Sequence, residues 1–290
     1  MEPSYTKENA VQRKISDFPK SKQIKLGAGS ALLPFFKERA RKLAVDPFSA
    51  ERKSIIDRFL RNGLYAEAFR KKDHRQLRKF LSNYWGHEAK NFHEHCEDRF
   101  ERMFLNHDVE VIGALEEHLQ SQDFDQLYEI GCGGGQVIEY LCNRLTSINH
   151  FTGIDLGEAQ IEVNRKNYHN PKLSFHAADA VEWIPKNAEA RSIFLTNGGV
   201  FEYFLQEELE TLFGHIAAER APAAVVVVET IGSDHNLETE KDSLIYGREM
   251  SFSHNYPHLF SEAGFTIAHQ SERPGYPEDG GGRWIRLLAV

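Results

Sequence analysis

Tyr128 to Gln136 read YEIGCGGGQ, a stretch that combines alternating glycines with a carboxylate. Glycine stands at Gly131, Gly133 and Gly135, where a backbone without Cβ atoms can turn tightly and lets a ligand approach the main chain. Glu129 lies two residues before the first of these glycines. The combination predicts a turn that binds a polar ligand, although a plain tight turn would use the same glycines.

Two aspartates follow this turn, each at the end of a short apolar run. Asp155 ends the run FTGID, 20 residues beyond Gly135, and Asp179 ends the run SFHAAD. A carboxylate can accept hydrogen bonds from two neighbouring hydroxyl groups of a ligand. Either aspartate could instead cap the helix that follows it, because Asp is a favoured N-cap residue.

These residues need a scaffold that brings the ends of several strands together. Helical patterns separate the short apolar runs, which predicts a doubly wound parallel sheet with helices on both faces. The run AVVVV suits a strand that is buried on both faces. Ligands of such sheets bind beyond the carboxyl ends of the strands. The five strands expected from this pattern are 126–130, 150–155, 172–178, 191–197 and 223–231.

Two further strands are expected at the C-terminal end, at 265–272 and 283–290. The segment between them, RPGYPEDGGG, cannot form a helix, so the pair should be a hairpin with one antiparallel strand. The expected fold is therefore α/β, with a doubly wound, mostly parallel sheet of seven strands and a C-terminal antiparallel hairpin.

The first 105 residues differ from the rest in pattern and charge. Residues 1–30 are polar and predict an extended arm, and apolar residues at three- and four-residue spacing predict helices from 32 to 119. Residues 1–90 contain 21 Lys and Arg against 10 Asp and Glu, whereas the whole chain contains 35 against 43. We expect an N-terminal arm and helical cap at 1–105 and a Rossmann-like domain at 106–290.

The glycine turn distinguishes two classes of nucleotide site. The pattern G-x-G-x-x-G of dinucleotide sites requires a third glycine where this chain has Gln136. The pattern E/D-x-G-x-G-x-G is complete from Glu129 to Gly135. On this motif and the predicted strand order, the sequence resembles the class I S-adenosylmethionine-dependent methyltransferases of the small-molecule type, over roughly residues 105–290.

The resemblance implies S-adenosyl-L-methionine as the cofactor, held by the loops that follow four strands. Asp155 would hold the ribose hydroxyls, Leu156 would pack on the adenine, and Asp179 would lie near the adenine amino group. An aromatic pair ahead of the domain, Tyr84 and Trp85, would close over the cofactor or pack the helices onto the sheet. The cofactor residues implied are Glu129, Gly131, Cys132, Gly133, Gly135, Asp155, Leu156, Asp179, Ala180, Tyr84 and, at the methionine end, Asn197 and Gly198.

Methyl transfer from a sulfonium is an in-line displacement, so the protein mainly aligns donor and acceptor and excludes water. A hydroxyl acceptor also needs a general base, whereas an amine can arrive neutral. Residues 232–252 form a long insert that the resemblance places on the substrate side. The predicted catalytic residues are His254 as the proton acceptor, Tyr256 as a hydrogen-bond partner of the acceptor, and His235 as the alternative base. We expect no metal site.

Three roles fit the basic N-terminal region. It could dock on the acidic remainder of the chain, cover the active site as a substrate cap, or bind nucleic acid. The acidic remainder would repel phosphates and no RNA-binding motif is present, so nucleic acid is the least favoured partner. An acidic carrier protein with a tethered substrate is a related alternative.

The expected function is methyl transfer to oxygen or nitrogen of a small-molecule acceptor, either free or carrier-tethered. Transfer of the aminocarboxypropyl group, RNA methylation through the basic region and a non-catalytic protein of the same fold stay open as alternatives. The loop TNGGVF lacks the Asn/Asp-Pro-Pro-Tyr/Phe signature of enzymes that methylate base amino groups. The acceptor, the regiochemistry and the oligomeric state cannot be predicted from the residues.

Composition predicts a cytoplasmic location. No run of about 18 apolar residues is present, and the N-terminus MEPSYTKENAVQRK has no apolar core typical of a signal peptide. The three cysteines form no disulfide framework and suggest a reducing compartment. We therefore expect no membrane partner.

Overall fold

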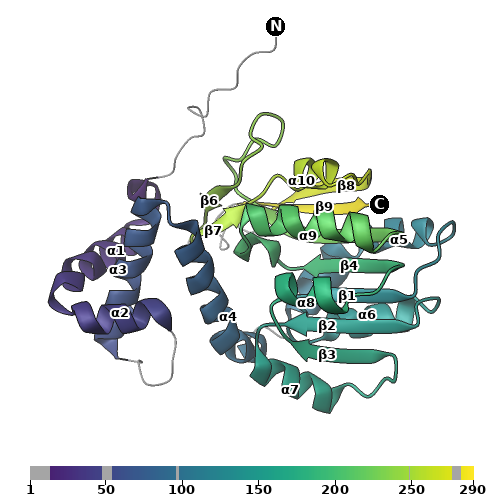
Figure 1. The fold of residues 1–290 in the computed structure, drawn as a ribbon, viewed down its shortest axis with the longest axis horizontal. Coiled ribbons are helices and arrows are strands. Elements are labelled where there is room, and N and C mark those ends of the chain that lie inside the picture. Colours follow the sequence, from purple (N-terminus) through teal and green to yellow (C-terminus); the bar gives the residue numbers. More distant parts are fainter. Residues whose placement is uncertain (1–13, 48–53, 96–97, 248, 276–281) are drawn as a thin grey trace, which may run out of the picture.

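Seven strands form one mixed sheet in the computed structural model (Figure 1), which describes residues 14–47, 54–95, 98–247, 249–275 and 282–290. The strand order is β3-β2-β1-β4-β5-β9-β8. All neighbouring pairs are parallel except those of β9, which is antiparallel to both β5 and β8. The strands are β1 (Gln126–Ile130), β2 (His150–Asp155), β3 (Leu173–Ala177), β4 (Ser192–Asn197), β5 (Ala223–Ile231), β8 (Ile267–Pro274) and β9 (Arg283–Ala289). The predicted fold class is confirmed.

Helices cover both faces of this sheet. Alternate residues of each strand enter opposite hydrophobic clusters: Val226 packs with α5, α6 and α7, and Val225 packs with α8, α9 and α10. In Figure 1, α8 and α9 lie in front of the sheet and α6 lies behind it. β5 is therefore buried on both faces, as its β-branched run predicts. The helices are α5 (Glu110–His118), α6 (Gln136–Arg144), α7 (Glu158–Asn167), α8 (Ala180–Asn187), α9 (Gln206–Glu219) and α10 (Tyr256–Glu262).

The N-terminal region is helical from residue 20. The prediction of an extended arm over 1–30 is therefore wrong for residues 20–30. Leu26 of the first helix is buried, and the helix crosses the third at two glycines. A Cβ on Gly29 would lie 2.4 Å from the backbone nitrogen of Gly63. The second glycine of KLGAGS thus permits close packing of two helices. The helices are α1 (Lys20–Leu32), α2 (Lys37–Val45), α3 (Ile55–Lys71) and α4 (His74–His95).

Shorter elements complete the fold. The 3-10 turns η1 (Ile15–Asp17), η2 (Leu33–Phe35) and η4 (Phe201–Tyr203) flank longer helices, and a π-helical segment, η3 (Phe100–Asp108), precedes α5. The insert contains a small hairpin that the sequence analysis did not predict, formed by β6 (Leu244–Tyr246) and β7 (Ser251–Ser253).

The insert and the N-terminal helices share one hydrophobic cluster. Phe69 of α3 and Phe80 of α4 pack with Met250 and Phe252 of the hairpin segment and with Leu205 ahead of α9. The boundary at residue 105 stays a prediction, because this core joins residues from both sides of it.

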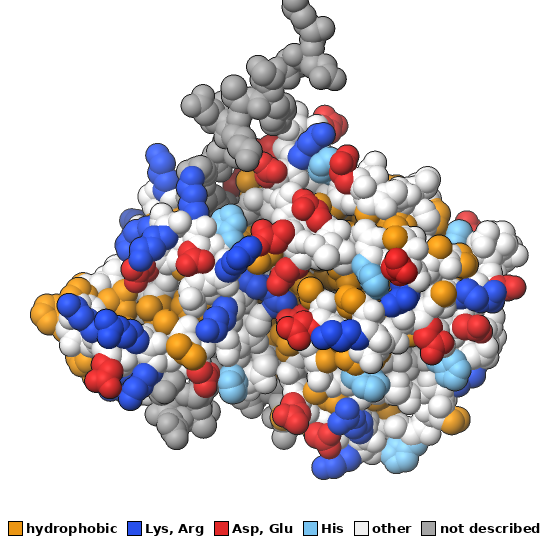
Figure 2. Space-filling view, viewed as in Figure 1, with side chains coloured by type: hydrophobic (Ala, Val, Ile, Leu, Met, Phe, Trp, Pro, Cys, Tyr) orange, Lys and Arg blue, Asp and Glu red, His pale blue; other side chains and the backbone are white. Residues whose placement is uncertain are grey.

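Helix α4 also makes ion pairs with the acidic part of the chain. Arg78, which is 7% exposed, binds Asp179 at 2.8 Å and Glu208 at 2.9 Å. The exposed Arg75 binds Glu207 at 3.1 Å. Some of the basic side chains of the N-terminal region thus form ion pairs with acidic residues of the same chain. Figure 2 shows Lys and Arg side chains gathered with hydrophobic ones over the N-terminal helices at the left. None of the helices in the described ranges is long and apolar enough to cross a membrane.

Candidate active site

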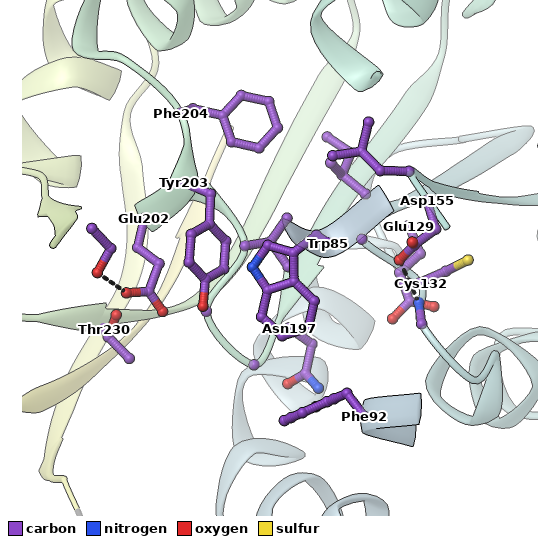
Figure 3. A pocket seen from close by; sticks show the side chains of 18 of the residues that line it. Trp85, Phe92, Glu129, Cys132, Asp155, Asn197, Glu202, Tyr203, Phe204 and Thr230 are labelled. Atoms are coloured by element: carbon purple, nitrogen blue, oxygen red, sulfur yellow. Dashed lines mark hydrogen bonds between the residues drawn. The ribbon is translucent and has the colours of Figure 1, made fainter. Parts of the chain in front are cut away.

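A cavity of about 470 Å³ opens at the carboxyl ends of the parallel strands. The loops after β1, β2, β3 and β4 line it, together with α4, η3 and the β6–β7 hairpin. Figure 3 shows Asp155, Glu129 and Cys132 at one side and Glu202 and Thr230 at the other, with Trp85 and Tyr203 between them. The volume falls within the range of about 300–1,000 Å³ typical of small-molecule sites.

The glycine turn has the backbone that its sequence predicts. Gly131, Gly133 and Gly135 have φ angles of +70°, +48° and +81°, which side chains with a Cβ rarely adopt. A Cβ at Gly131 would also lie 2.6 Å from a methyl group of Val200. The turn therefore requires glycine, and its main chain forms one wall of the cavity.

Glu129 is 2% exposed, and its Oε2 has no hydrogen-bond partner in the described structure. Burial raises the pKa of this carboxyl well above its usual value. Asn197, at the end of β4, has a buried side-chain oxygen that also lacks a described partner. Both side chains line the cavity. Unpartnered buried acceptors are costly, so these two indicate that a donor group of a ligand, such as an amino group, belongs here.

Arg99 is a cavity residue that the sequence analysis missed. Its Nη2 donates to the carbonyl oxygen of Gly198 at 3.4 Å, and its guanidinium lies over the ring of Phe92. It pairs with no carboxylate in the described part of the chain. A guanidinium beside the end of β4 is suited to a ligand carboxylate.

Asp155 connects two of the loops. Its Oδ2 accepts from the backbone N–H of Gly133 at 3.0 Å, and its Oδ1 accepts from that of Gly157 at 2.8 Å. Each carboxylate oxygen can accept a second hydrogen bond, so capacity remains for hydroxyl groups of a ligand. Leu156 and Ala180 line the same end of the cavity.

Asp179 adopts the capping role that the sequence left open. Its Oδ1 accepts from the backbone N–H of Val181 at 3.1 Å and caps α8. Its Oδ2 accepts from Arg78 at 2.8 Å. Asp179 lines the cavity, but its Oδ2 already accepts from a charged guanidinium, and its contact with an adenine amino group stays a prediction.

Of the predicted aromatic pair, Trp85 lines the cavity, whereas Tyr84 packs edge-on against it at 5.3 Å between ring centroids. Trp85 also contacts Phe92 and Tyr203, with ring centroids 5.2 and 5.3 Å away. Its indole Nε1 has no hydrogen-bond partner among the described residues. α4 thus extends an aromatic wall over the cavity.

Cys132 lines the cavity beside the glycines, and burial raises the pKa of its thiol well above the usual value. The thiolate is the reactive form of cysteine, so this environment favours a small packing residue over a nucleophile.

The predicted catalytic histidine, His254, is fully buried outside the cavity lining. Its Nε2 donates to the carbonyl oxygen of Phe201 at 3.0 Å, and its Nδ1 accepts from the hydroxyl of Ser243 at 2.6 Å. Burial lowers its pKa to about 3. The ring is neutral, as expected at a helix N-terminus, but neither nitrogen is available to an acceptor in the cavity. His254 as the proton acceptor stays a prediction that this geometry does not favour.

The other two predicted catalytic residues are also buried away from the cavity lining. Tyr256 donates to Glu229 at 3.4 Å. His235 contacts the hydroxyl of Ser253 at 2.8 Å and the carbonyl oxygen of Glu240 at 3.3 Å. Both side chains thus stabilise the insert and the start of α10, and their roles toward an acceptor stay predictions.

A polar cluster that the sequence analysis missed lies at the end of the cavity away from the glycine turn. Glu202 accepts from the hydroxyls of Tyr246 at 2.7 Å and Ser251 at 2.6 Å, and Tyr246 also contacts Thr230. Burial and the nearby charge of Glu249 raise the pKa of Glu202 to about 8. The available signal was a carboxylate four residues after Gly198, in a loop already assigned to the cofactor.

The sheet order, the glycine turn and the loop after β2 together define the class I S-adenosylmethionine-dependent methyltransferases. Residues 127–222 match the family model described as "Methyltransferase domain". This match lies within the domain expected at 106–290 and confirms the resemblance found in the sequence.

The chain is also similar to individual proteins. Malonyl-[acyl-carrier protein] O-methyltransferase from Brevibacillus brevis is 26% identical over 171 residues, which cover 53% of this chain. The match spans 60% of that relative's length. A SAM-dependent methyltransferase from Leishmania major superposes with a TM-score of 0.50 at 12% identity, over 74% of this chain and 82% of its own. Magnesium protoporphyrin IX methyltransferase from Synechocystis, solved with bound SAH, has a TM-score of 0.48 at 14% identity. The superposition covers 74% of this chain and 99% of that protein. At 12% identity the Leishmania structure shows the fold alone.

Proposed function

We propose that the protein transfers a methyl group from S-adenosyl-L-methionine to an oxygen or nitrogen of a small-molecule acceptor. The observation that carries this proposal is the continuous cavity that joins the four cofactor loops to a separate polar end. A site for the cofactor alone would not need the carboxylate, hydroxyl and aromatic groups at that far end.

The residues present fit the cofactor group by group. Glu129 and Asn197 have free buried acceptors for its amino group, and Arg99 offers a guanidinium for its carboxylate. Asp155 has capacity left for the ribose hydroxyls, and Leu156 offers an apolar surface for the adenine. When bound, the cofactor supplies an electrophilic methyl group on a positively charged sulfur.

The rest of the chain would align the acceptor and exclude water. Trp85 and Tyr203 cross the middle of the cavity, between the cofactor loops and the polar cluster (Figure 3). Holding the two reactants in line can lower the barrier by roughly 7–11 kcal/mol, without proton transfer by the protein.

A second candidate is the same reaction on an acceptor that a carrier protein holds. The Brevibacillus relative is named for a malonyl group on acyl-carrier protein. Here the N-terminal helices expose apolar side chains among basic ones, which suits an acidic partner. Methylation of a carrier-bound substrate but not of its free counterpart would support this variant.

Calorimetry and turnover test the main proposal. The protein should bind S-adenosylmethionine and S-adenosylhomocysteine but not NAD, and should form S-adenosylhomocysteine with members of an acceptor library. Asp155→Ala should weaken cofactor binding by roughly 1.5–3 kcal/mol, the value of hydrogen bonds to a charged group. Asp123→Ala, at an exposed aspartate outside the cavity lining, is the control. NAD binding without S-adenosylmethionine binding would contradict the proposal.

A further inference from the structure

The far end of the cavity combines two carboxyl groups with aromatic rings. Glu202 and Glu249 line it, and so do Trp85 and Tyr203. The hydroxyl of Tyr203 donates to Glu249 at 3.0 Å. Carboxyl groups beside ring faces favour a ligand with positive charge, because each attracts a cation.

Hydrogen bonds to one carboxyl oxygen fix the orientation of Glu202, and its other oxygen has no described donor. Its Oε2 accepts both of its hydroxyl donors, Tyr246 and Ser251. No described donor reaches its Oε1. A Cβ at Gly199, which has a φ of +81°, would lie 2.6 Å from this Oε1, so the loop after β4 leaves room for it only by having glycine there. Glu202 thus presents a free acceptor beside the loop that starts at Asn197.

Among the described residues, Lys22 interacts electrostatically with Glu249, but no basic side chain pairs with Glu202. Within that part of the chain, Glu202 and Glu249 form no ion pair with Lys or Arg. The arginines that line the cavity have other partners: Arg78 binds Asp179 and Glu208, and Arg283 binds Glu272 at 3.1 Å. Arg99 lies at Gly198, where it suits the carboxylate of the cofactor. A free carboxylate acceptor would meet like charge at this end.

We propose that the acceptor is an amine that enters as its ammonium form, bound between Glu202, Glu249 and the rings of Trp85 and Tyr203, and that Glu202 takes its proton. This inference rests on the proposed methyl transfer and narrows its substrate class. It excludes hydroxyl and carboxylate acceptors as the main substrates.

The step balances with the cofactor as the methyl donor. The ammonium gives one proton to Glu202, and the freed nitrogen lone pair forms a bond to the methyl carbon. The carbon–sulfur bond breaks and its electron pair stays on sulfur, which becomes neutral. The products are the methylated ammonium and S-adenosylhomocysteine, and Glu202 returns its proton to solvent.

The environment of Glu202 suits this proton transfer. Burial and the charges of Glu249 and Glu229 raise its pKa, while the hydroxyls of Tyr246 and Ser251 lower it, with a net value of about 8. An alkylammonium has a pKa of about 10, so the proton equilibrium is about three orders of magnitude less unfavourable than with an ordinary carboxyl.

Matched probes test the acceptor class. Amines from ethylamine to phenethylamine are compared with the alcohol and the carboxylic acid of the same carbon skeleton. Binding is measured by calorimetry with saturating S-adenosylhomocysteine, and turnover is measured with S-adenosylmethionine. Only amines should bind and be methylated. Glu202→Gln should weaken amine binding by about 10- to 100-fold and lower kcat by about 10²–10⁴-fold, with cofactor affinity within twofold. Glu182→Gln, at an exposed glutamate on α8, is the control.

Proton release separates a chemical role of Glu202 from a structural one. With a pKa of about 8, Glu202 is mostly protonated at pH 7 before the amine binds. When the ammonium binds, Glu202 loses its own proton to solvent and its carboxylate accepts a hydrogen bond from the ammonium. Amine binding should therefore release close to one proton, seen as a dependence of the binding heat on the ionisation heat of the buffer. The release should vanish above about pH 9, and in Glu202→Gln at any pH.

The outcomes are separable. If the wild-type protein does not bind S-adenosylmethionine, the proposed function itself is rejected. Cofactor binding with methylation of the alcohols or acids, or with no amine bound or methylated, rejects the amine assignment and leaves the cofactor site intact. Unchanged amine turnover in Glu202→Gln rejects Glu202 as the base.

Discussion

Arg78→Ala tests whether α4 is fixed to the catalytic domain by one buried guanidinium. The side chain of Arg78 is 7% exposed, and its partners Asp179 and Glu208 are 30% and 26% exposed. Its guanidinium also lies 4.6 Å from the ring centroid of Phe204. Removal leaves two carboxylates without their counter-ion, although Asp179 still caps α8 and Glu208 still accepts from the N–H of Leu205.

The magnitude follows from the burial of the three groups. Breaking a fully buried ion pair costs about 3–5 kcal/mol, and an exposed pair contributes about 0–1 kcal/mol. With an arginine that is buried and carboxylates that are about one quarter to one third exposed, we expect the free energy of unfolding to fall by about 2–3 kcal/mol. Cofactor affinity should fall with it, because Arg78 and Asp179 both line the cavity.

Urea unfolding followed by circular dichroism measures the first effect, and titration with S-adenosylhomocysteine measures the second. Arg75→Ala is the matched control, since its pair with Glu207 has side chains that are 83% and 60% exposed. It should change stability by less than about 0.5 kcal/mol. Equal losses in the two variants would refute the argument from burial, and intact cofactor binding in a destabilised Arg78→Ala would refute the link to the cavity.

Two further predictions concern packing and pH. Gly63→Ala should destabilise the protein by about 1–3 kcal/mol, because its Cβ would lie 2.5 Å from the carbonyl carbon of Gly29. Gly27→Ala is the control: its Cβ meets no atom within 4 Å, so the change should be neutral or slightly stabilising. Thermal unfolding of both variants measures the difference. His254→Ala should lower stability by about 1–3 kcal/mol at pH 7, because its hydrogen-bond partners lose their contacts. The pKa of His254 is lowered to about 3, so its contribution is complete above about pH 6.5 and is lost as pH falls toward 3, and urea midpoints of wild type and variant should converge over that window. If turnover of His254→Ala instead falls by about two orders of magnitude or more while stability is unchanged, the result would support His254 as the base.

Local patterns were sufficient to predict the sheet. Each parallel strand is an apolar run between helical stretches, and Gly131, Gly133 and Gly135 adopt positive φ angles that favour glycine. α1 was missed because its sequence is polar, and it is stabilised by Leu26 and by a close approach of Gly29 to Gly63, neither of which a local pattern reveals.

The acceptor end was harder to predict for the same reason. The sequence places His254 correctly before a helix, since Asn255 caps α10, but the direction of the imidazole depends on Phe201 and Ser243. Glu202 became a candidate only when the hairpin brought Tyr246 and Ser251 to it, from more than 40 positions away.

The hydrophobic cluster that joins α3, α4 and the β6–β7 hairpin has a consequence for protein engineering. One design for a hybrid methyltransferase transplants the N-terminal segment onto a foreign catalytic domain. If this chain supplied only the N-terminal segment, Phe69 and Phe80 would lose the contacts with Met250 and Phe252 that bury them. The N-terminal helices and residues 232–252 should therefore be transplanted together if a hybrid is to fold and to keep the donor's choice of acceptor.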